Sequence, residues 1–289
     1  MKVSGFTIVR NARKYDYPVV ESILSALPLC DEMIVSIGNS DDNTVELIQS
    51  IQSPKIRIVH SVWDETLREG GKLLAVETNK AKQHVSPDAD WCLYIQADEV
   101  LHEEGYVNLR QAMGDYLHQK SVEGLVLNYR HFYGSYQYVA DAYNWYRREV
   151  RIIRNSKHIS SWGDAQGFRR QGKKLSVKPV DAYVHHYGWV KNPKAQQRKQ
   201  ESFHKMWHSD EWVEQKVLKA DEFDYSKIDS LQLFTGTHPS VMQKRIAEQN
   251  WQFEFDTSKS RMKWKYRVRK WLEENVGVSI GEYRNYKLI

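Results

Sequence analysis

The chain has 289 residues, of which 41% are hydrophobic, and it carries 42 basic and 37 acidic side chains for a formal net charge of +5. This length and apolar fraction exclude a disordered chain and predict one large globular domain, with or without an extension. The positive charge is too small and too mixed in sign to indicate nucleic-acid binding, but it suits a small anionic ligand.

The cysteine content and the hydropathy pattern indicate where the protein resides. Cys30 and Cys92 lie beside apolar runs and are too few for a disulfide framework, which indicates buried thiols in a reducing compartment. The N-terminal apolar run is too short for a signal peptide, and no stretch approaches the roughly 20 apolar residues of a membrane span. We expect a cytoplasmic protein, and the basic run Lys259–Lys270 leaves peripheral contact with the inner membrane surface open.

Strand and helix patterns alternate through the first half of the chain. Helical spacing of apolar residues follows Pro18, Asn43 and Gly71, in the gaps between buried apolar runs. The predicted strands are Val3–Val9, Met33–Ile37, Ile56–Val59 and Trp91–Ile95. This alternation predicts an α/β fold with a mostly parallel central sheet flanked by helices, in which ligands bind beyond the carboxyl ends of the strands.

The second half contains three further strand patterns and then changes character. The strands are predicted at Gly124–Tyr129, Val150–Ile153 and Val180–His186, between loops rich in aromatic residues and glycine. From about Pro193 onward the pattern is helical and charged. We therefore expect one domain over residues 1–195 and a mainly helical extension over residues 196–289.

Two adjacent carboxylates, Asp98 and Glu99, follow the strand Trp91–Ile95. A charge is tolerated at the end of a buried strand if the strand opens into a cleft. A carboxylate there can hold a hard divalent cation against a diphosphate. A solvated turn or an N-terminal helix cap explains the same two residues equally well.

Tandem histidines, His185 and His186, end another predicted strand. Successive side chains of a strand point to opposite faces, so only one imidazole can easily face a cleft. That imidazole could complete a cation site with Asp98. For an isolated pair, an ordinary hydrogen-bonded histidine is the commoner explanation.

A glycine turn with two bases precedes the third predicted helix. Glycine lets the backbone approach a phosphate, a helix N-terminus attracts anions, and basic side chains neutralise them. The residues concerned are Arg68, Gly70, Gly71 and Lys72. A turn with solvated charges is the alternative explanation.

Taken in order, these motifs resemble the family 2 glycosyltransferases, which have the glycosyltransferase A fold, over roughly residues 3–195. Arg10-Asn11 and Ser40-Asp41 look like the turns that hold the nucleoside. The segment from Gln96 to Glu99 lies where the family has its Asp-x-Asp metal motif, with an uncharged amide in place of the first acid. His186 looks like the family's third metal ligand. The order and spacing of these motifs are more specific than any one of them.

The resemblance implies an enzyme that transfers a sugar from a nucleotide-diphosphate donor to a glycan, lipid-linked or protein acceptor, with inversion. It implies Mg²⁺ or Mn²⁺ bound by Asp98 and His186, and a loop carrying Trp189 and Lys191 that closes over the donor. The residues implied to contact the donor are Arg10, Asn11, Ser40, Asp41, Arg68, Gly71, Lys72, Gln96, Glu99, Trp189 and Lys191.

Inverting transfer requires a carboxylate base on the acceptor side. Asp164 is the best candidate, because it lies in a turn between glycines and next to Trp162, which could stack on a sugar. Asp141 and Glu149 are the other candidates. A structural Asp turn is as good an explanation of Asp164 as a catalytic role.

Other functions also fit the sequence. A nucleotidyltransferase would use a similar sheet but would release pyrophosphate instead of a nucleoside diphosphate. A catalytically silent protein of the same fold would bind a nucleotide sugar or a glycan without turnover, which Gln96 favours. An adaptor for a membrane or a nucleic acid would depend on the basic run Lys259–Lys270.

Overall fold

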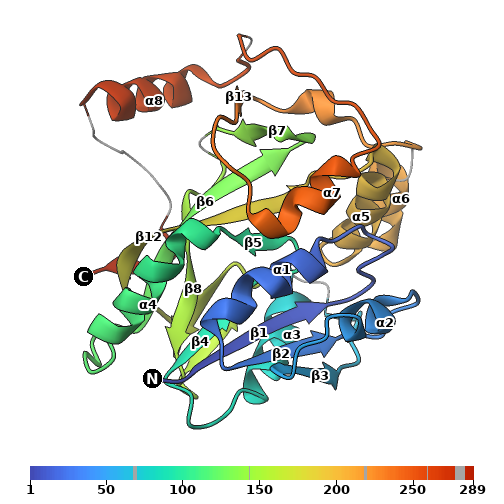
Figure 1. The fold of residues 1–289 in the computed structure, drawn as a ribbon. Helices are drawn as coiled ribbons and strands as arrows, with labels where there is room; N and C mark the ends of the chain where they lie inside the picture. Colours follow the sequence, from blue (N-terminus) through green and yellow to red (C-terminus); the bar gives the residue numbers. More distant parts are fainter. Residues whose placement is uncertain (68–69, 143, 218–219, 259, 277–283) are drawn as a thin grey trace.

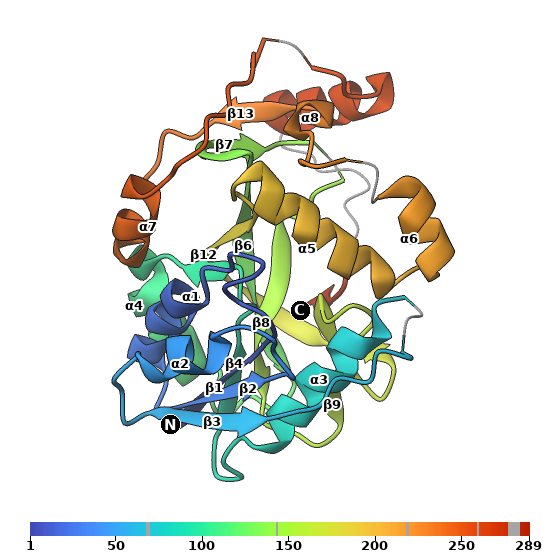
Figure 2. The ribbon, with the colours of Figure 1, turned by 90° about the vertical axis from the view of Figure 1, so that its right-hand side faces the viewer.

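The structure of the protein, a computed structural model, describes residues 1–67, 70–142, 144–217, 220–258, 260–276 and 284–289. In this part of the chain, a curled sheet of 11 strands runs through the centre. Helices cover both faces of the sheet (Figures 1 and 2). The α/β class predicted from the sequence is thereby confirmed.

The first half of the chain builds the parallel part of the sheet. Its elements are β1 (Val3–Val9), α1 (Val19–Ala26), β2 (Glu32–Ile37), α2 (Thr44–Gln49), β3 (Ile56–His60), α3 (Lys72–Gln83) and β4 (Trp91–Tyr94). The four strands are parallel and lie in the order β4-β1-β2-β3. Every residue of β1 and β4 is buried, as expected of parallel strands covered on both faces.

The next strands are mostly paired antiparallel. The elements are β5 (Glu99–Leu101), α4 (Tyr106–Asp115), β6 (Gly124–Tyr133), β7 (Ser135–Ala140), β8 (Arg148–Arg154) and β12 (Ser176–Trp189). β8 runs antiparallel to both β4 and β6, and β7 runs antiparallel to β6. The sheet is therefore mixed where a mostly parallel one was predicted. One physical reason is that only Gly134, at φ 73°, separates β6 from β7, which permits a hairpin but no crossover helix.

β12 brings distant parts of the chain together. It pairs in parallel with β6 and antiparallel with β5. In this register His186 lies opposite Glu99 of β5 and opposite His131 of β6. The predicted strand with the tandem histidines thus runs beside the segment that follows β4.

The later residues add helices and two more strands to this sheet. Their elements are α5 (Pro193–Lys205), α6 (Asp210–Lys216), β13 (Leu231–Leu233), α7 (Gln243–Ala247), α8 (Trp264–Val276) and β14 (Lys287–Leu288). β13 pairs with β7, and β14 pairs with β12. A separate small sheet consists of β9 (Ile159–Trp162), β10 (Gly167–Arg170) and β11 (Lys173–Lys174). α5 lies across one side of the main sheet (Figure 2).

Both cysteines are buried and are not joined in a disulfide. Burial raises the pKa of the Cys30 and Cys92 thiols to about 12, so both remain protonated at neutral pH. Their predicted role as buried thiols is confirmed. None of the helices in the described ranges has both the length and the apolar composition needed to cross a membrane.

Candidate active site

A cavity of about 320 Å³ opens at the carboxyl ends of β1 and β4, where the sequence predicted ligand binding. Its walls come from these strand ends, from the turn between β9 and β10, from the end of β12 and from α5. Six of the predicted site residues line it: Arg10, Gln96, Asp98, Asp164, His186 and Trp189. Residues from four separate segments of the chain therefore converge on one space.

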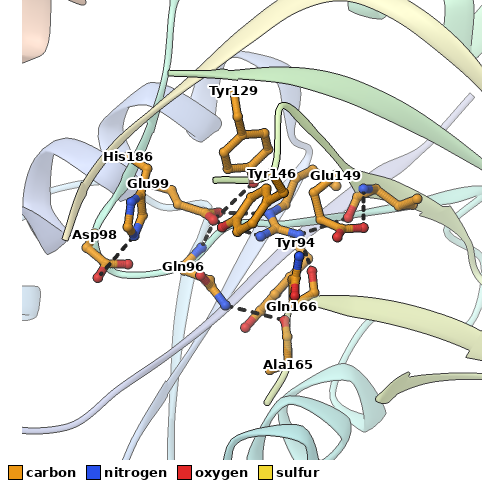
Figure 3. A network of polar contacts seen from close by, with 12 residues as sticks. Tyr94, Gln96, Asp98, Glu99, Tyr129, Tyr146, Glu149, Ala165, Gln166 and His186 are labelled. Atoms are coloured by element: carbon orange, nitrogen blue, oxygen red, sulfur yellow. Dashed lines mark hydrogen bonds and ion pairs between the residues drawn. The ribbon is translucent and has the colours of Figure 1, made fainter. Parts of the chain in front are cut away.

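Asp98 is the centre of a polar cluster in this cavity. Its Oδ2 atom lies 3.7 Å from Nε2 of His186 (Figure 3). Lys199, from α5, donates to the same oxygen at 3.0 Å and to the Gly188 carbonyl at 2.9 Å. Burial alone would raise the pKa of Asp98, but the charges of Lys199 and His186 hold it well below its usual range. Asp98 is therefore a carboxylate at neutral pH.

His131 fixes the orientation of His186. Burial, together with the neighbouring His186, lowers the pKa of His131 well below its usual range, so this imidazole is neutral at pH 7. Its Nε2 lies 2.7 Å from the Tyr146 carbonyl, which can only accept, so Nε2 carries the proton. Nδ1 of His131 then accepts from Nδ1 of His186 at 3.1 Å. This chain of hydrogen bonds turns Nε2 of His186 toward Asp98.

The residues around Asp98 do not by themselves form the predicted divalent-cation site. Among the described residues, no group of three or more His, Cys, Asp or Glu side chains is arranged to hold a metal ion. The Gln96 amide donates to the Ala165 carbonyl at 3.3 Å (Figure 3). Asp98 and His186 thus form an incomplete set of ligands, and an ammonium group already contacts Oδ2 of Asp98.

Gly188 packs against this cluster, and we predict that Gly188→Ala lowers the free energy of unfolding by about 1–3 kcal/mol through overpacking. The added methyl group would lie 2.6 Å from Nε2 of His186 and 2.7 Å from Oδ2 of Asp98. Urea denaturation measures the effect. The matched control is Gly114→Ala in α4, where nothing beyond the adjacent residues and backbone of its own helix lies within 4 Å of the added methyl group. We expect this control to match wild type or to gain up to about 1 kcal/mol. Equal stability of both variants would contradict the packing seen here.

Glu99 does not contact the cavity, although the sequence suggested a donor contact. Its carboxylate is fully buried and receives two hydrogen bonds from Arg151, at 2.9 and 2.7 Å. Tyr129 donates to it through its hydroxyl at 3.0 Å, and Gln96 through its backbone N–H at 3.0 Å (Figure 3). Arg151 also donates to the Gln166 carbonyl at 2.8 Å. Glu99 therefore holds the backbone of the cavity wall in place.

Asp164 lines the cavity from the turn between β9 and β10. Gly163 and Ala165 on either side have positive φ angles of 61° and 63°, and the Asp164 carboxylate accepts from the Gln166 N–H at 3.3 Å. Gly71, before α3, is in close contact with this turn, because a Cβ added to it would lie 2.7 Å from Cβ of Asp164. Gly71 thus lets α3 approach Asp164, and it does not line the cavity.

The other two candidate bases are engaged elsewhere. Asp141 pairs with Lys270 of α8. Glu149 is buried and accepts from the Val150 N–H at 2.8 Å. Of the three candidates, Asp164 alone lines the cavity.

Glu149 gives the protein a pH-dependent stability. Burial raises its pKa to about 7 from a usual value of 4.5, so the folded state binds this proton more tightly than the unfolded state does. The resulting stabilisation is complete below pH 4.5 and is lost as the pH rises to 7, a change of about 3 kcal/mol. We predict that Glu149→Gln removes this loss between pH 5 and pH 8 in urea denaturation. Glu46→Gln, on the exposed face of α2, should keep the wild-type profile.

The predicted nucleoside turns are connected to each other by hydrogen bonds. The Asp41 N–H donates to the Asn11 side chain at 2.9 Å, and the Asn11 N–H donates to the Ser40 hydroxyl at 3.0 Å. The Asp41 carboxylate pairs with Lys14 at 2.7 Å. None of Asn11, Ser40 and Asp41 lines the cavity, so the structure gives them a role in joining the ends of β1 and β2. Arg10 alone among the residues of these turns reaches the cavity.

Of the remaining residues predicted to contact the donor, one lines the cavity and the other described ones do not. Trp189 lines the cavity. Lys191 is fully buried, donates to the Asp16 carbonyl at 3.0 Å, and has a pKa lowered to about 7 by burial, with a smaller effect from Lys199. Lys72 is exposed at the start of α3 and does not line the cavity. Arg68 and Lys259 lie outside the described residues.

The contribution of α5 to the site was not predicted from the sequence. Five of its residues and neighbours line the cavity: Lys199, Gln200, Ser202, Phe203 and Met206. The helix begins where the Asn192 side chain accepts from the Lys194 N–H, with Pro193 in the first turn. This start signal lies only three residues after β12 and could have shown that a helix begins beside the end of β12, near the cavity.

Comparisons with known proteins give only distant likenesses. No family model and no curated protein matches the chain. S. aureus TarS matches with a TM-score of 0.40 and 16% identity over 70% of this chain and 39% of that chain, so the protein spans well under half of TarS. Anaerococcus prevotii 4-diphosphocytidyl-2C-methyl-D-erythritol synthase matches with a TM-score of 0.38 and 15% identity, over 66% of this chain and 91% of that chain. Glucosyl-3-phosphoglycerate synthase from Mycobacterium tuberculosis matches with a TM-score of 0.30 and 18% identity, over 45% of this chain and 43% of that chain. That structure is a complex with Mn²⁺, UDP and phosphoglyceric acid. At these scores, the function has to be derived from the cavity itself.

Proposed function

We propose that the protein is a glycosyltransferase that moves a sugar, with inversion, from a nucleoside-diphosphate donor to a hydroxyl group of a carbohydrate or glycolipid. The observation that carries the proposal is the content of the cavity. A carboxylate, Asp164, lines it together with two cationic side chains, Arg10 and Lys199. A transferase of this kind needs a base for the acceptor and positive charge for the departing diphosphate.

The aromatic lining fits a ligand with a base and a sugar. Side chains with flat apolar faces and polar edges suit the faces of nucleobases and pyranose rings. The aromatic residues of the cavity wall are Tyr15, Tyr17, Trp63, Tyr94, Trp145, Tyr146, Trp189 and Phe203. A cavity of about 320 Å³ also lies within the usual range for small-molecule sites.

Asp164 would act as the general base of the reaction. Its carboxylate would accept the proton of the acceptor hydroxyl as that oxygen attacks the anomeric carbon of the donor. The bond from this carbon to the diphosphate oxygen breaks, and its electron pair leaves with the diphosphate. Arg10 and Lys199 would offset the negative charge that develops there. One displacement of this kind inverts the anomeric configuration.

The test is a binding and turnover screen with UDP, GDP, ADP, CDP and their sugars. A ligand that binds only the folded state raises the melting temperature. We expect one nucleoside diphosphate to do so, and its sugar to yield that free nucleoside diphosphate in the presence of an acceptor. Release of pyrophosphate from a nucleoside triphosphate would favour a nucleotidyltransferase. Binding without turnover would indicate a silent protein, and no binding would refute the proposal.

Arg10 provides a matched pair of variants for the donor site. We predict that Arg10→Gln weakens binding of the nucleoside diphosphate about tenfold or more, because a charge-assisted hydrogen bond contributes roughly 1.5–3 kcal/mol. Arg13→Gln, three residues away on the exposed side of the same turn, should bind like wild type. Isothermal titration calorimetry measures both. Equal affinities of the two variants would remove Arg10 from the donor site.

A further inference from the structure

We infer that the ammonium group of Lys199 takes the place of a divalent cation at the donor diphosphate, so that donor binding requires no metal ion. The inference rests on the proposed function and specifies how the same site neutralises its ligand. It arises from the disagreement between the metal motif expected at Gln96 and Asp98 and the side chains that surround Asp98.

The position of Lys199 is the first observation. Its Nζ lies 3.0 Å from Oδ2 of Asp98 and 2.9 Å from the Gly188 carbonyl. His186 faces that same oxygen at 3.7 Å. The ammonium therefore lies at the carboxylate oxygen that such a metal would use, and His186 faces the same oxygen.

Lys199 is held firmly and still reaches the ligand space. Its side chain is only 12% exposed, yet it lines the cavity. An ammonium has three N–H donors, and the contacts with Asp98 and Gly188 use two of them. The third donor remains for an oxygen atom of the ligand. A cation fixed in this way needs little reorganisation when a diphosphate binds.

The charges around Asp98 match an ammonium better than a divalent ion. At nucleotide sites, Mg²⁺ is usually bound by one or two carboxylates, and phosphate and water oxygens supply its other ligands. Here Gln96 is neutral, and the Glu99 carboxylate is occupied by Arg151. Asp98 alone remains, and one carboxylate balances one ammonium.

A second lysine side chain, that of Lys191, lies close by. Lys191 and Lys199 both lie over the ring of Tyr17, with their Nζ atoms 4.9 and 5.1 Å from its centroid. Tyr17 also lines the cavity. The face of an aromatic ring attracts cations, so Tyr17 helps to keep the ammonium of Lys199 at this wall.

Calorimetric titration with UDP, GDP, ADP and CDP tests the inference without any variant. Wild type should bind one of them with the same Kd in EDTA and in Mn²⁺ or Mg²⁺. If EDTA abolishes binding and the metal restores it, the inference is overturned while the proposed function stands. If none of the four binds with or without metal, the proposed function fails and the inference fails with it.

A matched pair of lysine variants on α5 gives the second test. Lys199→Gln should weaken binding of the same nucleoside diphosphate in EDTA at least about tenfold. Lys194→Gln, 65% exposed on the same helix, should bind like wild type. Because Lys199→Gln leaves Asp98 without its ammonium partner, the variant Asp98→Asn/Lys199→Gln removes both charges and is expected to fold and to bind as weakly. Wild-type affinity in either Lys199 variant would overturn the inference.

Discussion

Replacing Arg151 by methionine is expected to lower the free energy of unfolding by about 3–5 kcal/mol, because it leaves a buried carboxylate without its counter-charge. Glu99 is 0% exposed, and Arg151 contacts both of its oxygens. Two remaining donors, Tyr129 and the backbone of Gln96, cannot supply a positive charge. The measurement is urea denaturation at neutral pH.

A second variant separates the loss of charge from the loss of packing. Glu99→Gln combined with Arg151→Met removes both charges, and we expect it to recover a large part of the stability. Arg148→Met, at an exposed position of the same strand, should change stability by no more than about 0.5 kcal/mol. If the double variant is as unstable as Arg151→Met, lost packing of the arginine, and not the isolated charge, explains the effect.

The second large effect is expected at Asp164. Asparagine has nearly the shape of aspartate but cannot accept the proton of the acceptor, so Asp164→Asn should lower kcat about 10²–10⁴-fold. Affinity for the nucleoside diphosphate should stay at the wild-type level, because the proposed role concerns the acceptor. Turnover of the donor sugar identified in the screen, together with calorimetry, measures both quantities.

Glu149→Gln is the informative comparison for Asp164→Asn. Glu149 was, with Asp141, one of the two other candidate bases, but it is buried and does not line the cavity. We expect Glu149→Gln to keep kcat near the wild-type value. Should Glu149→Gln lose turnover while Asp164→Asn keeps it, the role of base would pass to Glu149.

The parts of the fold that could be predicted are those with strong local patterns. β1 was predicted with its observed bounds, Val3–Val9, because a continuous apolar run is typical of a strand covered on both faces. β9, β10 and β11 were not predicted. These strands are two to four residues long, which is too short for an apolar periodicity to be recognised. Both residues of β11, Lys173–Lys174, are also exposed.

In the candidate site, too, residues marked by a local pattern could be predicted, whereas their partners from distant parts of the chain could not. The rule that ligands bind at strand ends pointed to Arg10 and Asp98 from the sequence, because Arg10 directly follows the predicted strand Val3–Val9 and Asp98 lies three residues after Trp91–Ile95. The partners of the acidic residues could not be found in this way. Lys199 is 101 residues from Asp98, and Arg151 is 52 residues from Glu99. Only the pairing of β8 with β4 and the position of α5 bring these charges together.

The pairing of β14 with β12 has a consequence for how the protein is synthesised. Residues 287 and 288 complete the edge beside Ser176 and Val177, and Asn285 accepts hydrogen bonds from Arg169 in the small sheet. These contacts span more than 100 residues, so they cannot form until residues 285–288 have left the ribosome. Until then this edge of β12 lacks its partner strand, and an unpaired strand edge can pair with another chain.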